Sequence, residues 1–349
     1  MSEKIQSISP LVDQFSRTIS YLRLSVTDHC NLRCMYCMPE HDGAGKPIKH
    51  GNFLHHDELL TYEELLRVVR IAVGMGMNKL RLTGGEPLVR RGILDFIKEL
   101  SKIDGLNQVL VTTNGVLLGE YAEDLLASGV HQVNVSLDTM HREKFKQISG
   151  RDYFDKVWES LLTVERLGFK VKLNAVAMKG INDDEFLDFA RLSLEHSFQI
   201  RFIEFMPAGD AGSWSQGRFC DSDEIIEKIR TIGSLEPSEK QRSSGPAKLY
   251  TFSSGGRKGT LGFISPISHH FCDQCTRLRL TSEGRLRPCL LHDIETDLRV
   301  LLRGGVSDDV VRNAIRDAIF NKPKGHQLNT VQDVVEKSHC SGGMSKIGG

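Results

Sequence analysis

The sequence lacks long apolar runs and lacks an excess of charge of either sign. Among its 349 residues, 45 are Lys or Arg and 45 are Asp or Glu, so the formal net charge is zero. A membrane-spanning helix needs about 20 consecutive apolar residues, and no run approaches that length. Balanced charge gives no overall attraction to nucleic acid or to an anionic membrane surface. We therefore expect neither partner, and any site for an anion must be a local cluster of basic residues.

A targeting pattern is also missing from residues 1–10, which contain no apolar core and place Glu3 beside Lys4. This composition is typical neither of a secretory signal nor of an Arg-rich transit peptide, and it favours a cytoplasmic protein. The eight cysteines then indicate metal binding or catalysis, because the cytosol keeps thiols reduced. Six of them fall into two clusters, whereas Cys220 and Cys340 stand alone and are interpreted as ordinary thiols.

Strand-like and helix-like segments alternate over the first 208 residues. Runs of alternating or continuous apolar character predict strands at residues 21–26, 79–83, 108–112, 132–137, 170–176 and 199–204. Helical patterns predict helices at residues 61–70, 93–100, 121–128, 154–167 and 184–194, the first opened by a capping box of Thr61 and Glu64. Six consecutive units of this kind indicate an α/β fold with a parallel sheet and right-handed crossovers.

The polar residues decide between a doubly wound sheet and a barrel. Nearly every unusual polar residue or glycine directly follows a predicted strand, and a barrel gathers all its strand ends around one mouth. Six units are too few for a closed barrel of eight. We therefore predict a partial (β/α)6 TIM-like barrel over residues 1–208 and a smaller C-terminal α+β region over residues 209–349 that closes its mouth.

The C-terminal region begins with a Gly/Ser-rich linker at residues 209–217 and includes a polar stretch at residues 233–256. Helices are predicted at residues 223–230, 297–302 and 308–320, and short strands at residues 260–264 and 277–280, followed by a hairpin turn at residues 282–285.

The first cysteine cluster is a C-x3-C-x2-C run made of Cys30, Cys34 and Cys37. Fe-S clusters are held by cysteine thiolates, normally four, so three local ligands leave one iron of a cubane open to a substrate or cofactor. Two simpler alternatives are a structural zinc site completed by His29 or His41, and three unconnected buried thiols. Zinc sites favour paired C-x2-C units, so the spacing favours the Fe-S cluster.

A glycine-rich turn, residues 84–87 (Gly-Gly-Glu-Pro), follows the second predicted strand. The glycines allow a close approach of backbone to ligand, and the Glu86 carboxylate can accept a hydrogen bond from an amine. Alone, the motif equally fits a plain tight turn. Together with the cysteine run it resembles the radical SAM superfamily, in which S-adenosylmethionine (SAM) chelates the open iron and is cleaved to a 5'-deoxyadenosyl radical.

The second cysteine cluster is a C-x2-C-x13-C arrangement of Cys272, Cys275 and Cys289. Its spacing equally permits a zinc ribbon with His269, His270 or His292 as fourth ligand. Between these cysteines lie Arg277 and Arg279, which share one face of a strand and suit bidentate binding of a phosphate or a base edge.

Further basic residues lie on or beside other predicted strands, several of them within apolar runs: Arg23, Lys79, Arg81, Lys172 and Arg201. A solvated strand face is the ordinary explanation for such residues. A buried cation, however, needs an anionic ligand or a carboxylate partner, and a polyphosphate would satisfy several cations at once.

Several segments together resemble the molybdenum cofactor biosynthesis protein A family of radical SAM GTP 3',8-cyclases. They are residues 21–39 around the first cysteines, residues 81–88, residues 203–207, the second cysteine triplet with its two arginines, and the terminal residues 344–349. The resemblance covers nearly the whole chain. It departs from the family at Ser16, where Gly is commoner, and at His29, where Arg or Lys is commoner.

The resemblance implies a set of site residues. Those expected to bind GTP are Arg23, Arg81, Thr112, Lys172, Arg277 and Arg279, with Lys79 and Arg201 as weaker additions. Those expected to contact SAM are Tyr36, Gly85, Ser136 and Met206. Each cysteine triplet would hold a 4Fe-4S cluster, and the second cluster's open iron would take the guanine base. Residues expected to act in catalysis are Arg277, Arg279, Gly348 and Gly349, the last two at a tail that reaches into the site.

The implied reaction begins with removal of the ribose 3' hydrogen, followed by attack of the carbon radical on C8 of guanine. Reduction and proton transfer then give (8S)-3',8-cyclo-7,8-dihydroguanosine 5'-triphosphate. An external electron donor and a homodimer are further expectations from the family. One alternative is another radical SAM enzyme with an auxiliary cluster, such as a peptide maturase, although those carry more C-terminal cysteines. A non-catalytic Fe-S or zinc protein is the other, although it needs no cofactor pocket.

Overall fold

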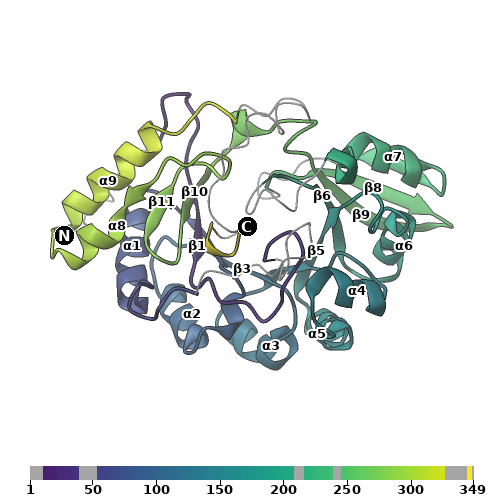
Figure 1. Ribbon diagram of the computed structural model, residues 1–349, viewed down its shortest axis with the longest axis horizontal. Helices are drawn as coiled ribbons and strands as arrows, with labels where there is room; N and C mark the ends of the chain where they lie inside the picture. The colour runs from purple at the N-terminus through teal and green to yellow at the C-terminus, as the bar shows by residue number, and fades with distance from the viewer. Residues whose placement is uncertain (1–10, 39–52, 208–215, 239–244, 327–343, 348–349) are drawn as a thin grey trace, which may run out of the picture.

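The strands of the protein form one sheet that curves into an open arc, with helices along its outer side (Figure 1). The computed structural model describes residues 11–38, 53–207, 216–238, 245–326 and 344–347. The strands of the barrel are β1 (Tyr21–Ser25), β2 (Lys79–Thr83), β3 (Gln108–Thr113), β4 (Gln132–Ser136), β5 (Lys170–Ala177) and β6 (Gln199–Glu204). Those that follow are β7 (Ser234–Pro237), β8 (Lys248–Ser254), β9 (Arg257–Ile264), β10 (Arg277–Leu280), β11 (Arg285–Arg287) and β12 (Thr296–Asp297).

The predicted strands β1 to β6 are present in sequential parallel order, which confirms the α/β fold and the open barrel. The C-terminal region extends the same sheet at both edges. Strand β10 pairs in parallel with β1, and β9 pairs in parallel with β6. Eight strands thus run parallel, yet the barrel stays open because antiparallel strands, β11 and β12 at one edge and β8 and β7 at the other, continue outward. A domain boundary at residue 208 stays a prediction.

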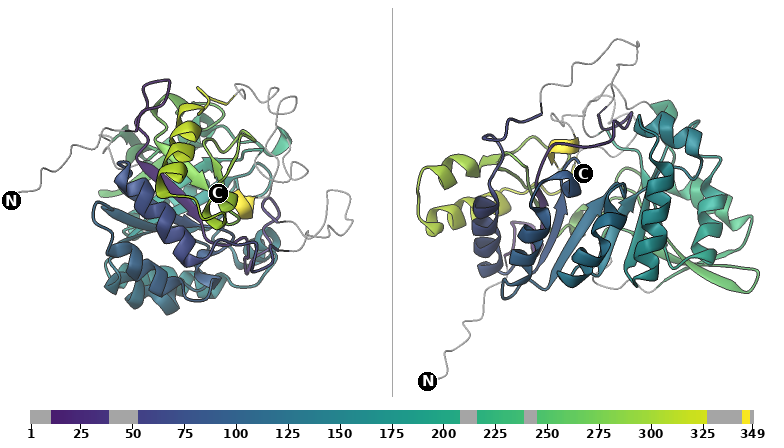
Figure 2. Two further views of the ribbon diagram at one scale, coloured as in Figure 1. Left: turned by 90° about the vertical axis from the view of Figure 1, so that its left-hand side faces the viewer. Right: turned by 90° about the horizontal axis from the view of Figure 1, so that it is seen from below.

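The helices lie side by side on the outer face of the sheet (Figure 2), except the short C-terminal helix, which lies inside the arc (Figure 1). They are α1 (Tyr62–Gly74), α2 (Ile93–Ser101), α3 (Leu118–Ala127), α4 (Arg142–Ser149), α5 (Phe154–Arg166), α6 (Phe186–Glu195), α7 (Ser222–Arg230), α8 (Leu298–Arg303), α9 (Asp308–Phe320) and α11 (Met344–Ile347). The predicted capping box of α1 is formed, with Glu64 N donating to Thr61 Oγ1 at 3.2 Å and Thr61 N to Glu64 Oε2 at 2.7 Å. Within the described residues, none of these helices combines the length and apolar character needed to span a bilayer.

Strands β7 and β8 and helix α4 differ from the sequence-based expectation. Residues 233–256, predicted as a polar stretch, contain strands β7 and β8, and the fully buried Phe252 anchors β8 to the core. Pro237 ends β7, which is the edge strand of the sheet. Proline has no N–H to donate, and on an edge strand this costs no hydrogen bond between strands. Helix α4 was not predicted. It precedes α5 in the connection between β4 and β5 and supports the first cysteine loop. Most of the predicted linker at residues 209–217 lies outside the described residues.

Candidate functional site

One cavity of about 360 Å³ lies on the concave side of the sheet and is lined by both cysteine triplets. Residues of β1 to β6 and β10 form its walls, because alternate side chains of each parallel strand point to the same side. The six clustered cysteines that reach it are Cys30, Cys34, Cys37, Cys272, Cys275 and Cys289. Segments more than 200 residues apart in the sequence therefore share one site.

The end of α4 supports the first cysteine loop through two main-chain hydrogen bonds. Arg33 N donates to Ser149 O at 2.8 Å and Met35 N to Ile148 O at 2.9 Å. Burial raises the pKa of the Cys30 thiol to about 11 and the pKa of the Cys34 thiol well above its usual value. Burial thus outweighs the charge of Arg33 and favours the neutral thiol at Cys30, and a bound metal would supply the positive charge that thiolates need.

The spread of the sulfur atoms distinguishes a cluster from a single metal ion. Two thiolates on one tetrahedral zinc lie about 4 Å apart. Among the described residues, the groups of His, Cys, Asp and Glu whose ligand atoms all lie within 4.8 Å are His270 with Cys272 and His326, and Asp221 with Asp223 and His269. Neither cysteine triplet is that compact. The first triplet therefore fits a larger centre, such as a four-iron cluster, better than a single ion. At the second triplet the three sulfurs are likewise spread, but Cys272 also belongs to a compact group with His270 and His326 that could hold one ion.

The glycine-rich turn after β2 passes directly beneath the cysteine loop. A Cβ on Gly84 would lie 2.3 Å from Thr27 O, and a Cβ on Gly85 would lie 2.2 Å from His29 O. Gly85 N and Glu86 N donate to these same two carbonyls at 2.7 and 2.8 Å. The glycines are thus required for the crossing of two loops as well as for lining the cavity.

The Glu86 carboxylate does not face the cavity, contrary to its expected role as acceptor for a ligand amine. It is fully buried and accepts hydrogen bonds from Thr113 Oγ1 at 2.8 Å, Asn114 N at 2.6 Å and Leu88 N at 3.1 Å. Burial raises its pKa to about 7. Glu86 therefore joins the turn after β2 to the end of β3.

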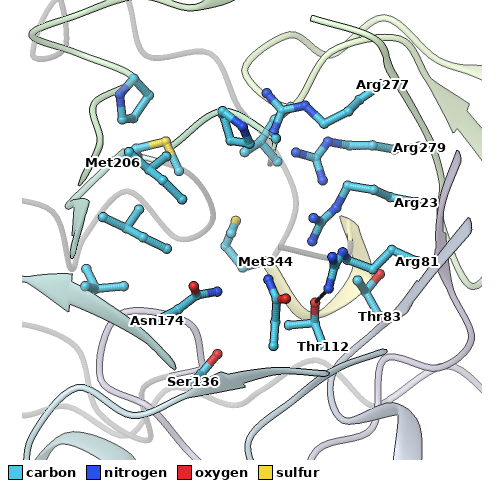
Figure 3. A pocket seen from close by; sticks show the side chains of 18 of the residues that line it. Arg23, Arg81, Thr83, Thr112, Ser136, Asn174, Met206, Arg277, Arg279 and Met344 are labelled. Carbon is cyan, nitrogen blue, oxygen red and sulfur yellow. Dashed lines mark hydrogen bonds between the residues drawn. The ribbon is translucent and has the colours of Figure 1, made fainter. Parts of the chain in front are cut away.

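The four residues expected to contact SAM all line the cavity: Tyr36, Gly85, Ser136 and Met206. Figure 3 places Ser136 and Met206 on the side away from the arginines. Tyr36 Oη donates to Asp138 Oδ2 at 2.7 Å, and burial raises the pKa of Asp138 to about 6. Asp138 is one of the polar residues that follow a predicted strand, and nothing else in the sequence marks it. It is the one acidic side chain among the described residues that line the cavity.

All seven basic residues singled out in the sequence line the cavity: Arg23, Lys79, Arg81, Lys172, Arg201, Arg277 and Arg279. Strand register places Arg23 between Arg81 and Arg279, and Figure 3 shows these arginines along one wall. Burial and the charge of Arg279 hold the pKa of Arg23 well below its usual value. Burial and neighbouring Arg201 and Arg81 lower the pKa of Lys172 to about 7. Such mutual repulsion indicates a site for a multiply charged anion.

Two basic residues that the sequence did not indicate hold the second triplet in place. The Arg17 guanidinium donates to the carbonyl oxygens of Cys272, Pro323 and Lys324 at 2.7 to 3.0 Å. Lys322 Nζ donates to Arg277 O at 3.0 Å and also contacts Pro288 O. No local motif marks either residue, because their partners are main-chain carbonyls far away in the sequence.

The charges near the second triplet favour a thiolate. Burial alone would raise the pKa of Cys275, but Arg277 and Lys322 outweigh it and lower that pKa to about 6. Of the three histidines considered as zinc ligands, His270 lies near Cys272, together with His326, which was not anticipated. His269 pairs with Asp223 at 2.9 Å. The third, His292, contacts Gly325 O at 3.1 Å.

Some predicted residues lie outside the part of the chain that the structure describes: His41, Cys340, Gly348 and Gly349. The residues just before the terminal glycines are described. Met344 lines the cavity, as Figure 3 shows, and Ile347 is buried. His29 stacks on Phe53 with ring centroids 4.3 Å apart, which accounts for an aromatic residue at this departure from the family.

Comparison with known proteins identifies the family. The model for the radical SAM superfamily matches residues 24–193, and the model described as Molybdenum Cofactor Synthesis C matches residues 198–328. The GTP 3',8-cyclase of Thermodesulfovibrio yellowstonii is 47% identical over 320 residues, which are 91% of this chain and 96% of that protein. The chain belongs to the GTP 3',8-cyclase family. The family member of Alkaliphilus oremlandii is 43% identical over 338 residues, covering 97% of this chain and 99% of its own.

Solved structures confirm the barrel. Streptococcus suis SuiB bound to S-adenosylmethionine superimposes with a TM-score of 0.60 at 15% identity, covering 86% of this chain and 67% of that chain. At this identity the similarity concerns the fold alone. Membership of the GTP 3',8-cyclase family makes the chain a radical SAM enzyme that uses SAM and a 4Fe-4S cluster.

Proposed function

We propose that the chain converts GTP to (8S)-3',8-cyclo-7,8-dihydroguanosine 5'-triphosphate, the first step of molybdenum cofactor biosynthesis. The observation that carries this proposal is a single cavity lined by two cysteine triplets and by eight arginine and lysine side chains. A cofactor site beside a dense cationic wall suits a nucleoside triphosphate. The same wall disfavours the maturase alternative, because a peptide substrate carries no comparable negative charge.

The first triplet, Cys30, Cys34 and Cys37, holds the cluster that binds SAM. Tyr36, Gly85, Ser136 and Met206 contact SAM beside it. When bound, the cluster and SAM supply the 5'-deoxyadenosyl radical. The chain itself closes this end of the cavity, because the loops after β1 and β2 cross in direct backbone contact. This closure keeps water and stray reductants away from the radical.

The cationic wall binds the triphosphate through Arg23, Arg81, Lys172 and, in addition, Lys79 and Arg201. Thr112 contributes a hydroxyl next to Arg81, whose Nη1 donates to Thr112 Oγ1 at 3.1 Å. Lys79 and Arg201 rank as full members of this set, because both line the cavity and depress the pKa of Lys172.

The second triplet, Cys272, Cys275 and Cys289, holds a second 4Fe-4S cluster whose open iron takes the guanine base. Three observations support a cluster over zinc. The sulfurs are less compact than one ion requires, neighbouring cations favour a thiolate at Cys275, and the triplet faces the cavity. Arg277 and Arg279 then lie between base and phosphates and orient the nucleotide during catalysis.

The terminal Gly348 and Gly349 act in the cavity. Met344 lines the cavity and Ile347, which directly precedes Gly348, is buried. The reaction also needs an electron from outside the chain, so an external electron donor is a partner. A cytoplasmic location and a homodimer stay predictions.

The decisive experiment uses anaerobically reconstituted protein. Two four-iron cubanes give about eight irons per chain. With a reductant, the protein should then consume GTP and SAM and yield 5'-deoxyadenosine and the cyclised nucleotide. Cys30→Ala should abolish deoxyadenosine formation, while the matched control Cys220→Ala keeps full iron and turnover. Deoxyadenosine without GTP consumption would contradict the proposed substrate, and zinc at the second triplet would contradict the two-cluster proposal.

A further inference from the structure

Three buried oxygen atoms in the cavity have no hydrogen-bond partner among the described residues: Thr83 Oγ1, Asn134 Oδ1 and Asn174 Oδ1. Asn174 is in register with Ser136, which is expected to contact SAM, so its oxygen lies on the cofactor side of the cavity. Thr83 and Asn134, which are 2% and 8% exposed, lie on the side of the cations. A buried polar atom without a partner is costly, and a ligand that supplies the partner recovers that cost on binding. These atoms therefore indicate where a polar ligand group binds.

Strand register places the two residues in one row across the cavity. Asn134 on β4 lies between Thr112 on β3 and Lys172 on β5, and Thr83 ends β2 on the other side of Thr112. Arg81 lies two residues before Thr83, on the same face of the strand. The row is thus a neutral band, Thr83, Thr112 and Asn134, with a cation near each end.

The chemistry of the two oxygens restricts the ligand group. An amide oxygen only accepts hydrogen bonds, so its partner must carry an N–H or O–H. A triphosphate that is fully ionised has no donor. The guanine donors are expected at the second triplet, beside Arg277 and Arg279 on β10, which lies beyond β1 from this row. The remaining donors of the nucleotide are the ribose hydroxyls. The ribose joins the guanine base to the triphosphate and therefore lies between their two sites.

We propose that Thr83 and Asn134 bind the two ribose hydroxyls of the nucleotide, one each, and thereby select ribonucleotides over deoxyribonucleotides. This inference rests on GTP as the substrate of the same cavity. A site built to hydrogen-bond a hydroxyl rejects the analogue that lacks it, because its own polar group is then left buried and unpaired. Holding both hydroxyls also fixes the ribose carbon from which hydrogen is removed.

The test measures equilibrium binding to the reconstituted holoenzyme without reductant, so that no turnover occurs. The nucleotides are GTP, 2'-deoxy-GTP and 3'-deoxy-GTP, and SAM is measured separately. The wild-type protein should bind each deoxy analogue about tenfold more weakly than GTP. Asn134→Ala should remove the discrimination against one analogue, and Thr83→Val, which keeps the side-chain shape, should remove it against the other.

Two controls separate binding from folding. Because neither oxygen has a partner among the described residues, neither substitution should lower the thermal unfolding midpoint of the free protein. Ser282 also carries a buried hydroxyl oxygen without a partner among the described residues, but it does not line the cavity. Ser282→Ala should therefore leave all nucleotide affinities unchanged.

The outcomes distinguish this inference from the function on which it rests. If the wild-type protein binds no GTP, the proposed function fails. If it binds GTP and discriminates against the deoxy analogues, but both variants discriminate equally, the ribose assignment is overturned. A loss of SAM affinity with unchanged GTP affinity would assign the oxygens to the ribose of the cofactor and would likewise overturn the inference.

Discussion

At the scale of single residues, the cavity is dominated by cations that repel one another. Burial lowers the pKa of Arg201 and of Arg279 to about 10 each, and like charges add to the effect. The charges also act on Tyr21: burial alone would raise its pKa, but Arg81, Arg23 and Lys79 lower it to about 8. A bound anion reduces the repulsion among these cations, and this favours its binding.

Lys172 gives the cavity a measurable pH dependence. Its pKa is about 7 in the free protein, and a bound triphosphate will raise that pKa by neutralising its cationic neighbours. Binding therefore takes up a proton between pH 7 and the pKa of the complex. We expect GTP affinity to fall as pH rises from about 7 to 9, by at most about tenfold per pH unit. Titration calorimetry in buffers of different ionisation enthalpy measures the proton uptake.

Substitutions identify the residue responsible for this pH dependence. Lys172→Met should bind GTP more weakly with a flat pH profile. Lys170→Arg, at the exposed start of β5, should keep the wild-type profile. A steep profile in Lys172→Met would assign the proton to another group.

Ser16, which departs from the family, adopts a backbone conformation that favours glycine. Its φ is 62°, the one positive φ of a described non-glycine residue. The left-handed conformation costs an L-residue about 1–2 kcal/mol, partly offset by the greater chain entropy of glycine. We expect Ser16→Gly to raise the free energy of unfolding by about 0.5–1 kcal/mol. Urea unfolding measures this, and Ser16→Ala, which retains the Cβ, should give no such gain.

At the scale of elements, the site depends on loops that contact each other through buried polar groups. The turn after β2 is tied to the cysteine loop by main-chain hydrogen bonds and to the end of β3 by the Glu86 carboxylate. Gly85 belongs to that turn, and the cofactor is expected to contact it. The position of SAM is thus coupled to a buried carboxylate that does not touch it.

Glu86→Gln tests that coupling. The amide NH2 group of Gln cannot accept from Asn114 N or Leu88 N, so at least one buried donor loses its partner. We expect the free energy of unfolding to fall by about 1–3 kcal/mol, and SAM to bind more weakly. Denaturant unfolding and equilibrium SAM binding are the measurements. Glu123→Gln on the exposed face of α3 should change neither, and equal losses in both variants would rule out the coupling.

Arg17 couples the N-terminal segment to the loop of the second triplet. Its guanidinium reaches three carbonyl oxygens and the Asp13 carboxylate, an arrangement that a single ammonium group cannot reproduce. We expect Arg17→Lys to lower the iron content from about eight towards about four per chain, because only the second site loses its support. Iron analysis measures this. The exposed Arg316→Lys on α9 should retain all iron, and loss from the first site instead would contradict the assignment.

At the scale of the whole molecule, an open barrel brings the first strand and the C-terminal segments to one cavity. Strand β10 pairs with β1, which places the second triplet beside the mouth, and helix α11 brings Met344 into the cavity. An open barrel leaves room between its edges for these C-terminal segments. A closed eight-stranded barrel would instead fill its interior with side chains.

Removal of Gly348 and Gly349 tests the role of the tail. We expect turnover of GTP to fall at least about tenfold while iron content and SAM binding stay at wild-type values, because neither cluster loses a ligand. Replacement of both glycines by Ala should lower turnover as well, since a Cβ limits close approach. Unchanged turnover in the truncated protein would show that the end of the chain is merely frayed.

The sequence by itself determined the ligand types, the six strand–helix units and the family, because these depend on residue chemistry, periodicity and short spacings. The tertiary structure decided which atoms meet. Strand register put Thr83, Thr112 and Asn134 in one row, and loop crossing turned Glu86 away from the cavity. Arg17 and Lys322 support the second triplet through main-chain carbonyls, which carry no sequence signal. Such long-range contacts arise only once the packed sheet fixes the positions of distant segments.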